Sequence, residues 1–334
     1  REIFDLIKMI FLFTGIFELC GTFFLFIHWV HEYPVFRALY LALFHSVSAF
    51  CNAGFSLFSE SLMKYPGAWL PNMTICMLIF LGGIGFPVLY ELFVAGFKTP
   101  WRRVRFSVQT KTVLMTSMGL VLSGALFFLI LEWDSILKDK ALNERLLISL
   151  FQSITCRTAG FNTVDIGALH TATLTVMLAL MFFGASPGSC GGGVKTTTLA
   201  VIFAFARSRF RTMLRTHLFK KSIPDEVISK STSLILISLG WIALIVFLIL
   251  LSRPSTLYPN PHGDFLPYLF ETVSAFGTVG LSMGATATLT GMGKFWIILM
   301  MLIGRVGVLT FSYLITGPSK DRRIEYAEEQ MMIG

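Results

Sequence analysis

Residues 45–55 read HSVSAFCNAGF, and two later stretches align with them without gaps. These are FQSITCRTAGF at residues 151–161 and ETVSAFGTVGL at residues 271–281. Each copy ends with a polar residue, a small or branched residue, a glycine and an apolar residue. The glycines lie about a hundred residues apart, and self-similarity at a long period is typical of an architecture built from repeated units. The sequence therefore predicts three copies of one structural unit.

The chain around these stretches is strongly apolar. Hydrophobic residues make up 54% of its 334 residues and charged residues only 14%, whereas a soluble domain has about 25% charged residues. Six blocks approach or exceed the length of about 20 residues that crosses a bilayer core. The expected spans are residues 7–30, 72–93, 112–131, 174–205, 234–251 and 295–315. This composition excludes an ordinary soluble protein and predicts a multi-pass membrane protein.

Three shorter segments separate the spans of each pair. They cover residues 33–71, 133–173 and 253–293, and each is too interrupted by polar residues, Gly and Pro to cross a membrane. Each continues as an amphipathic stretch that ends at one of the repeated glycines. The repeated unit is therefore expected to be a long helix, a short re-entrant helix, a glycine loop and a second long helix.

The distribution of positive charge predicts the orientation. If the glycine loops lie outside, most of the 27 Lys and Arg residues fall in inside segments, mainly residues 98–111 and 207–230. An excess of Lys and Arg on cytoplasmic loops is expected of a membrane protein. The net charge of +8 therefore does not indicate a nucleic-acid partner. Both ends of the chain are expected on the cytoplasmic side.

The glycine loops have the features of an ion pathway. Irregular backbone at membrane depth is tolerated only inside protein or along a water-filled cavity, so three such loops predict one shared pore. Glycine permits positive φ, and a ring of carbonyl oxygens replaces the water shell of an alkali cation. A single loop of this kind would be interpreted as a turn, but three copies favour a selectivity filter for an alkali cation. The candidate filter residues are Asn52, Ala53, Gly54, Thr158, Ala159, Gly160, Thr278, Val279 and Gly280.

The fourth expected span is interrupted by GASPGSCGGGVK, residues 184–195. Glycine and proline disfavour helix, so we expect a break here and interpret it as a mobile constriction below the filter. A phosphate-binding loop is disfavoured because Val194 stands where the GxxxxGK pattern requires lysine. The candidate gate residues in this segment are Gly188, Gly191, Gly192, Gly193 and Lys195. Lys195 either holds a closed state by binding an acid or a loop carbonyl, or extends to the inner interface.

Arg305 lies inside the last expected span and is a further candidate gate residue. A cation within a membrane span is costly and is usually functional. Its position after Gly280 places positive charge near the expected pore axis. The alternative is a structural pairing with Glu91 or with a helix-end carbonyl.

The sequence contains no recognisable catalytic or metal-binding set. The five cysteines form no CxxC pair, and the six histidines form no HExxH motif. We therefore expect no transition metal, no disulfide framework and no resident cofactor. An integral-membrane enzyme remains a distant alternative.

The filter segments, together with SPGSCGGGVKTTT at residues 186–198 and GRVGVLTF at residues 304–311, resemble the Trk/Ktr/HKT superfamily of potassium transporters. The closing EYAEEQMMIG is most similar to the membrane subunits of bacterial Ktr systems. This resemblance implies an all-α integral membrane fold, with pseudo-symmetric M1–pore helix–M2 repeats around a central ion pore. Residues 1–97, 98–206 and 207–334 resemble the second, third and fourth of four such repeats. A first repeat is expected to be missing, and three repeats are not expected to close a filter alone.

The resemblance also implies a function and partners. It implies potassium uptake across the bacterial plasma membrane, with the break at residues 184–195 as the gate and Arg305 opposing cation passage. Glycine, rather than serine, at the three filter positions favours potassium, and a pore for sodium or ammonium is the alternative. Potassium is then the substrate, and sodium is a candidate activator. The implied partners are membrane lipid, a second copy of the chain and a cytosolic nucleotide-binding ring of the RCK type, which would contact the basic loops and the C-terminal tail.

Overall fold

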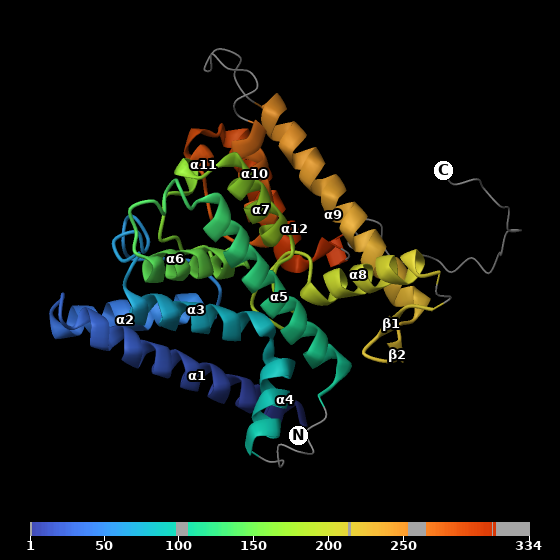
Figure 1. Ribbon diagram of the computed structural model, residues 1–334, viewed down its shortest axis with the longest axis horizontal. Helices are drawn as coiled ribbons and strands as arrows, with labels where there is room; N and C mark the ends of the chain where they lie inside the picture. The colour runs from blue at the N-terminus through green and yellow to red at the C-terminus, as the bar shows by residue number, and fades with distance from the viewer. Residues whose placement is uncertain (1, 98–105, 213–214, 253–264, 309, 312–334) are drawn as a thin grey trace, which may run out of the picture.

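The computed structural model describes residues 2–97, 106–212, 215–252, 265–308 and 310–311. Almost all regular structure in these ranges is helical (Figure 1). Among the described residues, three unbroken helices are long and apolar enough to cross a membrane, and each begins one repeat of the element order. They are α1 (Glu2–Trp29), α5 (Val108–Leu131) and α9 (Asp225–Leu251). The first, third and fifth expected spans correspond to these helices.

Each long helix is followed by a short helix that ends at a filter segment. These pore helices are α2 (Val35–Phe50), α6 (Leu142–Thr155) and α10 (Phe265–Gly277). A second apolar helix follows the filter segment in each unit. These helices are α3 (Trp69–Ile84), α7 (Thr171–Phe182) and α12 (Gly291–Val306), with the short η2 (Ile166–Ala168) and α11 (Ala285–Thr288) preceding the last two. The element order of long helix, pore helix, filter and second helix therefore occurs three times (Figure 1).

The second helix of each unit is interrupted. After α3 the chain bends by 102° into α4 (Phe86–Phe97), and Gly85 at the bend has a φ of +89°. After α7 an irregular loop precedes α8 (Thr196–Phe210). After α12 the helix ends at Gly307, whose φ is +94°. These breaks inside the expected spans at residues 72–93 and 295–315 were not predicted; each glycine adopts a left-handed conformation that cannot continue an α-helix.

Two of these breaks, at Gly85 and Gly307, have another glycine three residues earlier. Gly82 and Gly304 allow the second helices to pack closely against the pore helices. A β-carbon on Gly82 would lie 1.9 Å from the carbonyl oxygen of Phe50, and one on Gly304 would lie 1.9 Å from that of Phe276. Only glycine allows so close an approach between backbones. The second helices of these two units are thereby pressed against the ends of their own pore helices.

Large apolar side chains cover the outside of the long helices. At most 28% of the apolar window of α1, α5 or α9 is buried inside the protein. Phe11, Leu122 and Phe247 are among the exposed side chains. A helix that is apolar on its protein face and on its outer face is expected where lipid, not water, surrounds it. The structure therefore has the surface of a membrane protein.

One small element departs from the all-helical architecture. After α8, β1 (His217–Leu218) pairs antiparallel with β2 (Lys221–Ser222) (Figure 1). The basic residues 98–105, the start of the third re-entrant segment at 253–264 and the C-terminal tail at 312–334 lie outside the described residues.

Candidate functional site

The three filter segments share one backbone conformation. In each, the polar residue and the glycine have positive φ, with one residue between them. The φ values are 51°, 70° and 52° at Asn52, Thr158 and Thr278, and 71°, 89° and 92° at Gly54, Gly160 and Gly280. Positive φ is uncommon for any residue with a side chain and is rare for β-branched threonine. Such strained positions cluster at functional sites, where the surrounding structure holds them.

Hydrogen bonds at the ends of the pore helices hold this conformation. The Ala53 amide donates to the Ser48 carbonyl at 2.9 Å, and the Val279 amide donates to the Ser274 carbonyl at 2.9 Å. These are the long bonds of a Schellman motif, which requires a left-handed residue just before the donor. The left-handed Asn52 and Thr278 therefore terminate α2 and α10 and start their filter segments.

A pore-helix side chain also fixes the far end of each filter segment. In each unit it binds a residue two or three positions after the filter glycine. The pairs are His45 with Ser56 at 3.0 Å, Gln152 with Thr163 at 3.2 Å, and Glu271 with Ser282 at 2.5 Å. The residue types differ, but the connection is the same. Each filter segment is therefore pinned to its own pore helix at both ends.

The filter segments lie side by side. A β-carbon on Gly54 would lie 2.3 Å from the carbonyl oxygen of Ala159, and one on Gly160 would lie 2.2 Å from that of Val279. Two residues before these glycines, the Asn52 side-chain amide and the Thr158 hydroxyl lie 3.1 Å apart. The three copies that are distant in sequence thus place their backbones around one region, and each of these glycines faces a carbonyl of the next unit.

The glycine-rich loop between α7 and α8 lies against the polar residues of the filter. The Gly192 amide donates to the Thr278 hydroxyl at 3.0 Å. A β-carbon on Gly191 would lie 2.2 Å from the hydroxyl oxygen of Thr158. Gly193 has a φ of +69° and packs against Gly277 at the end of α10. The structure thus brings this loop together with two of the three filter segments.

The same loop is bonded to the break between α3 and α4. The Ser186 amide donates to the Gly83 carbonyl at 2.9 Å, and the Phe86 amide donates to the Gly188 carbonyl at 3.1 Å. Gly188 itself has a φ of +74°. A movement of the loop relative to α3 and α4 must therefore break these two hydrogen bonds.

Two cationic side chains donate hydrogen bonds to backbone carbonyls of this loop. The Lys195 ammonium donates to the Gly191 carbonyl at 2.6 Å, and the Arg305 guanidinium donates to the Cys190 carbonyl. Glu91 instead accepts from the Ser107 amide at 2.6 Å, so it is not the partner of Arg305. Consecutive loop carbonyls are thus bound by cations from two different helix ends.

One buried cation near the filter was not among the sequence candidates. Arg157 directly precedes Thr158 and is only 6% exposed. Its guanidinium donates to the Ser117 carbonyl at 3.3 Å and to the Ser117 hydroxyl at 3.0 Å, which ties the end of α6 to α5. An arginine inside an apolar, glycine-bearing segment was the available signal, since a charge in such a position is rarely accidental.

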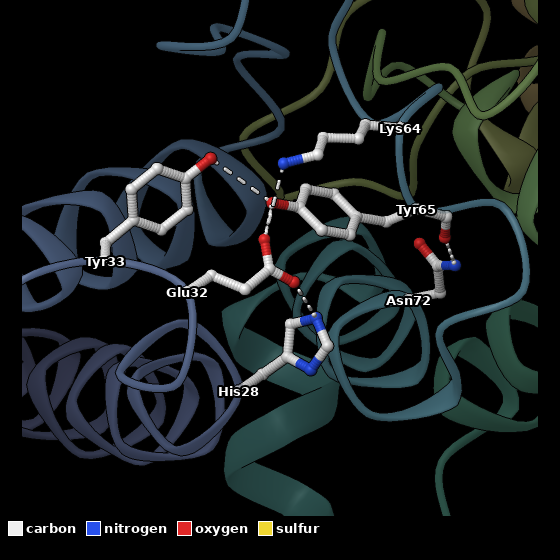
Figure 2. Close-up of polar contacts among 6 residues, drawn as sticks. All are labelled: His28, Glu32, Tyr33, Lys64, Tyr65 and Asn72. Carbon is white, nitrogen blue, oxygen red and sulfur yellow. Dashed lines mark hydrogen bonds and ion pairs between the residues drawn. The ribbon is translucent and has the colours of Figure 1, made fainter.

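A polar cluster fixes the long connection between α2 and α3. Figure 2 shows the Glu32 carboxylate, just after α1, accepting from the Tyr65 hydroxyl at 2.6 Å and pairing with the Lys64 ammonium at 3.5 Å. Burial and the bond to Glu32 raise the pKa of Tyr65. The Leu62 amide in the same connection donates to the Asn162 carbonyl at 3.0 Å, directly after the second filter segment. This cluster therefore positions a connection that contacts the end of the second filter segment.

Comparison with known proteins finds cation transport proteins that are similar to this chain. Residues 1–321 match the model of the TrkH family, described as cation transport protein. The chain is 37% identical over 337 residues to Ktr system potassium uptake protein B of Bacillus subtilis, covering 98% of this chain and 71% of that relative. It is 33% identical over 327 residues to potassium/sodium uptake protein NtpJ of Enterococcus hirae, covering 96% of this chain and 70% of that relative.

A solved structure shows the same fold. The crystal structure of the potassium transporter TrkH from Vibrio parahaemolyticus matches with a TM-score of 0.75 at 17% identity. The match covers 97% of this chain and 66% of that chain. The expected all-helical membrane fold is therefore confirmed.

Proposed function

Because the chain belongs to the TrkH family of cation transport proteins, we propose that it is the pore-forming membrane subunit of a Ktr-type potassium uptake system. The observation that carries this proposal is the set of three adjacent filter segments, in which Gly54 and Gly160 each pack against a carbonyl of the next unit. Backbone carbonyls in such an arrangement replace the hydration shell of a potassium ion. Passage is passive, driven by a membrane potential that contributes about 2.3 kcal/mol per charge for each 100 mV.

The gate in this proposal is the loop at residues 184–195. Its contacts with Thr158 and Thr278 place it directly against the filter, Arg305 holds it there from α12, and Lys195 closes the loop on its own Gly191 carbonyl. The described arrangement is then the closed one, and Arg305 additionally opposes passing cations by its charge. Gating moves the loop away from the filter and leaves the filter segments on their pore helices.

The proposed orientation follows the charge distribution. The filter faces outward, and the basic residues at the end of α8 and in the hairpin face the cytoplasm, as the positive-inside tendency requires. Both ends of the described chain then lie on the cytoplasmic side.

The proposed assembly is a homodimer that binds a cytosolic nucleotide-binding ring through its basic loops. Support comes from the names of two relatives, which describe them as proteins of a Ktr system. Light scattering of the purified protein tests the dimer, and a molar mass of one copy would contradict it.

Sodium is the second candidate for the transported or activating ion. One relative that covers nearly the whole chain is named a potassium/sodium uptake protein. The filter glycines themselves favour potassium, because Gly280 and its two counterparts add no side-chain ligand of their own to the backbone carbonyls.

Gly280→Ser tests the proposed selectivity. Gly280 has a φ of +92°, so serine strains the filter backbone and adds a hydroxyl beside the carbonyls. We expect the ratio of rubidium to sodium uptake to fall by about tenfold, which corresponds to about 1.4 kcal/mol of lost discrimination. Uptake is measured in bacteria that lack their own potassium uptake systems.

Gly284→Ser is the matched control for this substitution. Gly284 has a similar φ of +86°, but a β-carbon there meets nothing within 4 Å and the residue lies outside the filter. The control is expected to keep the parental ratio. An unchanged ratio in Gly280→Ser would contradict the filter assignment, and a parental protein that takes up sodium in preference to rubidium would favour the second candidate ion.

A further inference from the structure

A cavity of about 760 Å³ lies away from the ion pathway, between the first half of α5, the helix α8 and the hairpin β1–β2. Figure 1 shows these elements side by side where α8 ends. The volume is within the range of about 300–1,000 Å³ that is typical of small-molecule sites. The cavity is therefore large enough for a ligand and is not used by the proposed transport mechanism.

The two ends of this cavity differ in chemistry. Its apolar wall is made by Met115 and Leu120 of α5 and by Leu199 and Phe203 of α8. Arg207 and Arg211 line it at the end of α8, and no Asp or Glu is among the lining residues. A long apolar wall that ends in two guanidinium groups is complementary to an amphiphile with an anionic head.

The charges at this end have no partner within the described part of the chain. Neither Arg207 nor Arg211 forms an ion pair there. Arg209, between them in sequence, lies over the Phe205 ring at 5.1 Å and does not line the cavity. Arg207 in the last turn of α8 and Arg211 directly after it, four residues apart, thus face the cavity without an ion-pair partner among the described residues, while Arg209 contacts Phe205.

We propose that this cavity binds an anionic phospholipid, with its phosphate on Arg207 and Arg211 and an acyl chain along the apolar wall of α5 and α8. Arginine recognises phosphate through charge-assisted, bidentate hydrogen bonds. The apolar wall includes α5, one of the long membrane helices, and its Met115 and Phe203 side chains are exposed, so a membrane lipid reaches it without crossing water. This inference requires only the membrane fold and does not depend on which ion the protein carries.

The position of the site connects it to the gate. Leu199 and Ala200 line the cavity in the first turn and a half of α8, directly after Lys195, whose ammonium binds the loop carbonyl of Gly191. A ligand stabilises the arrangement to which it binds. The bound lipid therefore favours the position of α8 in which Lys195 holds the loop, and it lowers ion flux.

The headgroup contact is tested by binding. The purified, delipidated protein is titrated in detergent with phosphatidylglycerol or phosphatidylcholine and followed by native mass spectrometry. Arg207→Gln with Arg211→Gln is expected to weaken phosphatidylglycerol binding about 30-fold, since each basic residue near an anionic lipid contributes about a factor of five. Arg209→Gln is the matched control and should bind as the parent does. Equal affinity in the double variant and the control, or equal binding of both lipids by the parent, would overturn the proposal.

The acyl-chain contact is tested by filling the cavity. Gly119 lines it, and a β-carbon there meets nothing within 4 Å, so the side chain of Gly119→Leu starts in open space and extends into the cavity. It should abolish phosphatidylglycerol binding while both arginines remain. Gly240→Leu on α9 is the control, because Gly240 also has open space around its β-carbon but lies outside the cavity. Unchanged lipid binding by Gly119→Leu, or displacement of the lipid by inorganic phosphate, would overturn the acyl-chain assignment. If Gly119→Leu instead dissociates a dimer and leaves lipid binding unchanged, the occupant of the cavity is a second copy of the chain.

Rubidium flux from liposomes tests the link to the gate. Phosphatidylglycerol should slow flux through the parent and through Gly240→Leu, but not through Gly119→Leu. A flux that phosphatidylglycerol leaves unchanged in the parent would overturn this link.

Discussion

Replacing Gly160 by alanine is expected to abolish rubidium uptake while the protein still reaches the membrane. Gly160 has a φ of +89°, a conformation that costs an alanine about 1–2 kcal/mol. The added β-carbon would also lie 2.2 Å from the Val279 carbonyl oxygen, so the backbone of the neighbouring filter segment must move. Because that carbonyl belongs to the proposed ion site, a displacement large enough to relieve the clash removes the ligand geometry.

The control for this variant is Gly15→Ala. Gly15 lies in α1, and a β-carbon there meets nothing within 4 Å, so uptake should equal that of the parent. Membrane levels of each variant, measured by immunoblot, separate a blocked pore from a missing protein. Parental uptake by Gly160→Ala at equal membrane level would contradict the packing that the filter assignment requires.

Replacing Arg305 by methionine is expected to raise the rate of rubidium uptake. The guanidinium holds the Cys190 carbonyl of the gate loop, and a hydrogen bond from a charged group is worth about 1.5–3 kcal/mol. Loss of that bond raises the open-to-closed ratio about tenfold or more. Removal of the positive charge also lowers the barrier to a passing cation. Methionine keeps much of the length of the side chain, so the change is confined to charge and hydrogen bonding.

Two further variants define what this result means. Lys195→Met removes the bond to the Gly191 carbonyl and should also raise uptake, whereas Lys294→Met should leave it unchanged. Lys294 is exposed in the first turn of α12, distant in sequence from Arg305 at its end. The rubidium-to-sodium ratio should stay parental in all three variants. Uptake that falls, or a ratio that changes with Arg305→Met, would contradict a role in closing the gate.

The sequence predicts the architecture well, because its signals are long and repeated. Three aligned loops and long apolar blocks predicted a helical membrane protein, and the motifs at residues 186–198 and 304–311, with the filter segments, resembled the Trk/Ktr/HKT superfamily. The structure and the comparisons confirm the fold and the family. The breaks at Gly85 and Gly307 were not predicted. A single glycine in an apolar helix is equally consistent with close helix packing, as Gly82 shows three residues earlier. Only the backbone conformation distinguishes the two uses of glycine.

The candidate site was predicted as separate residues, not as an arrangement. The filter and gate residues were chosen from local pattern, and their roles remain predictions. The contact of Gly192 with Thr278 joins residues of different units and depends on how their helices pack, which no local pattern encodes. The same holds for Arg305 and the Cys190 carbonyl. Arg157 was missed because its partners belong to another helix, although its charge was visible in the sequence.

The most direct test of the account is to locate the bound ion. Thallium substitutes for potassium and scatters anomalously, so crystals of the protein grown in thallium reveal its binding sites. We predict a strong anomalous peak beside the backbone carbonyls of the filter segments, adjacent to Gly54, Gly160 and Gly280, and loss of that peak when sodium replaces thallium. Thallium bound only at other places in the pore, with none at these carbonyls, would contradict the assignment of the filter.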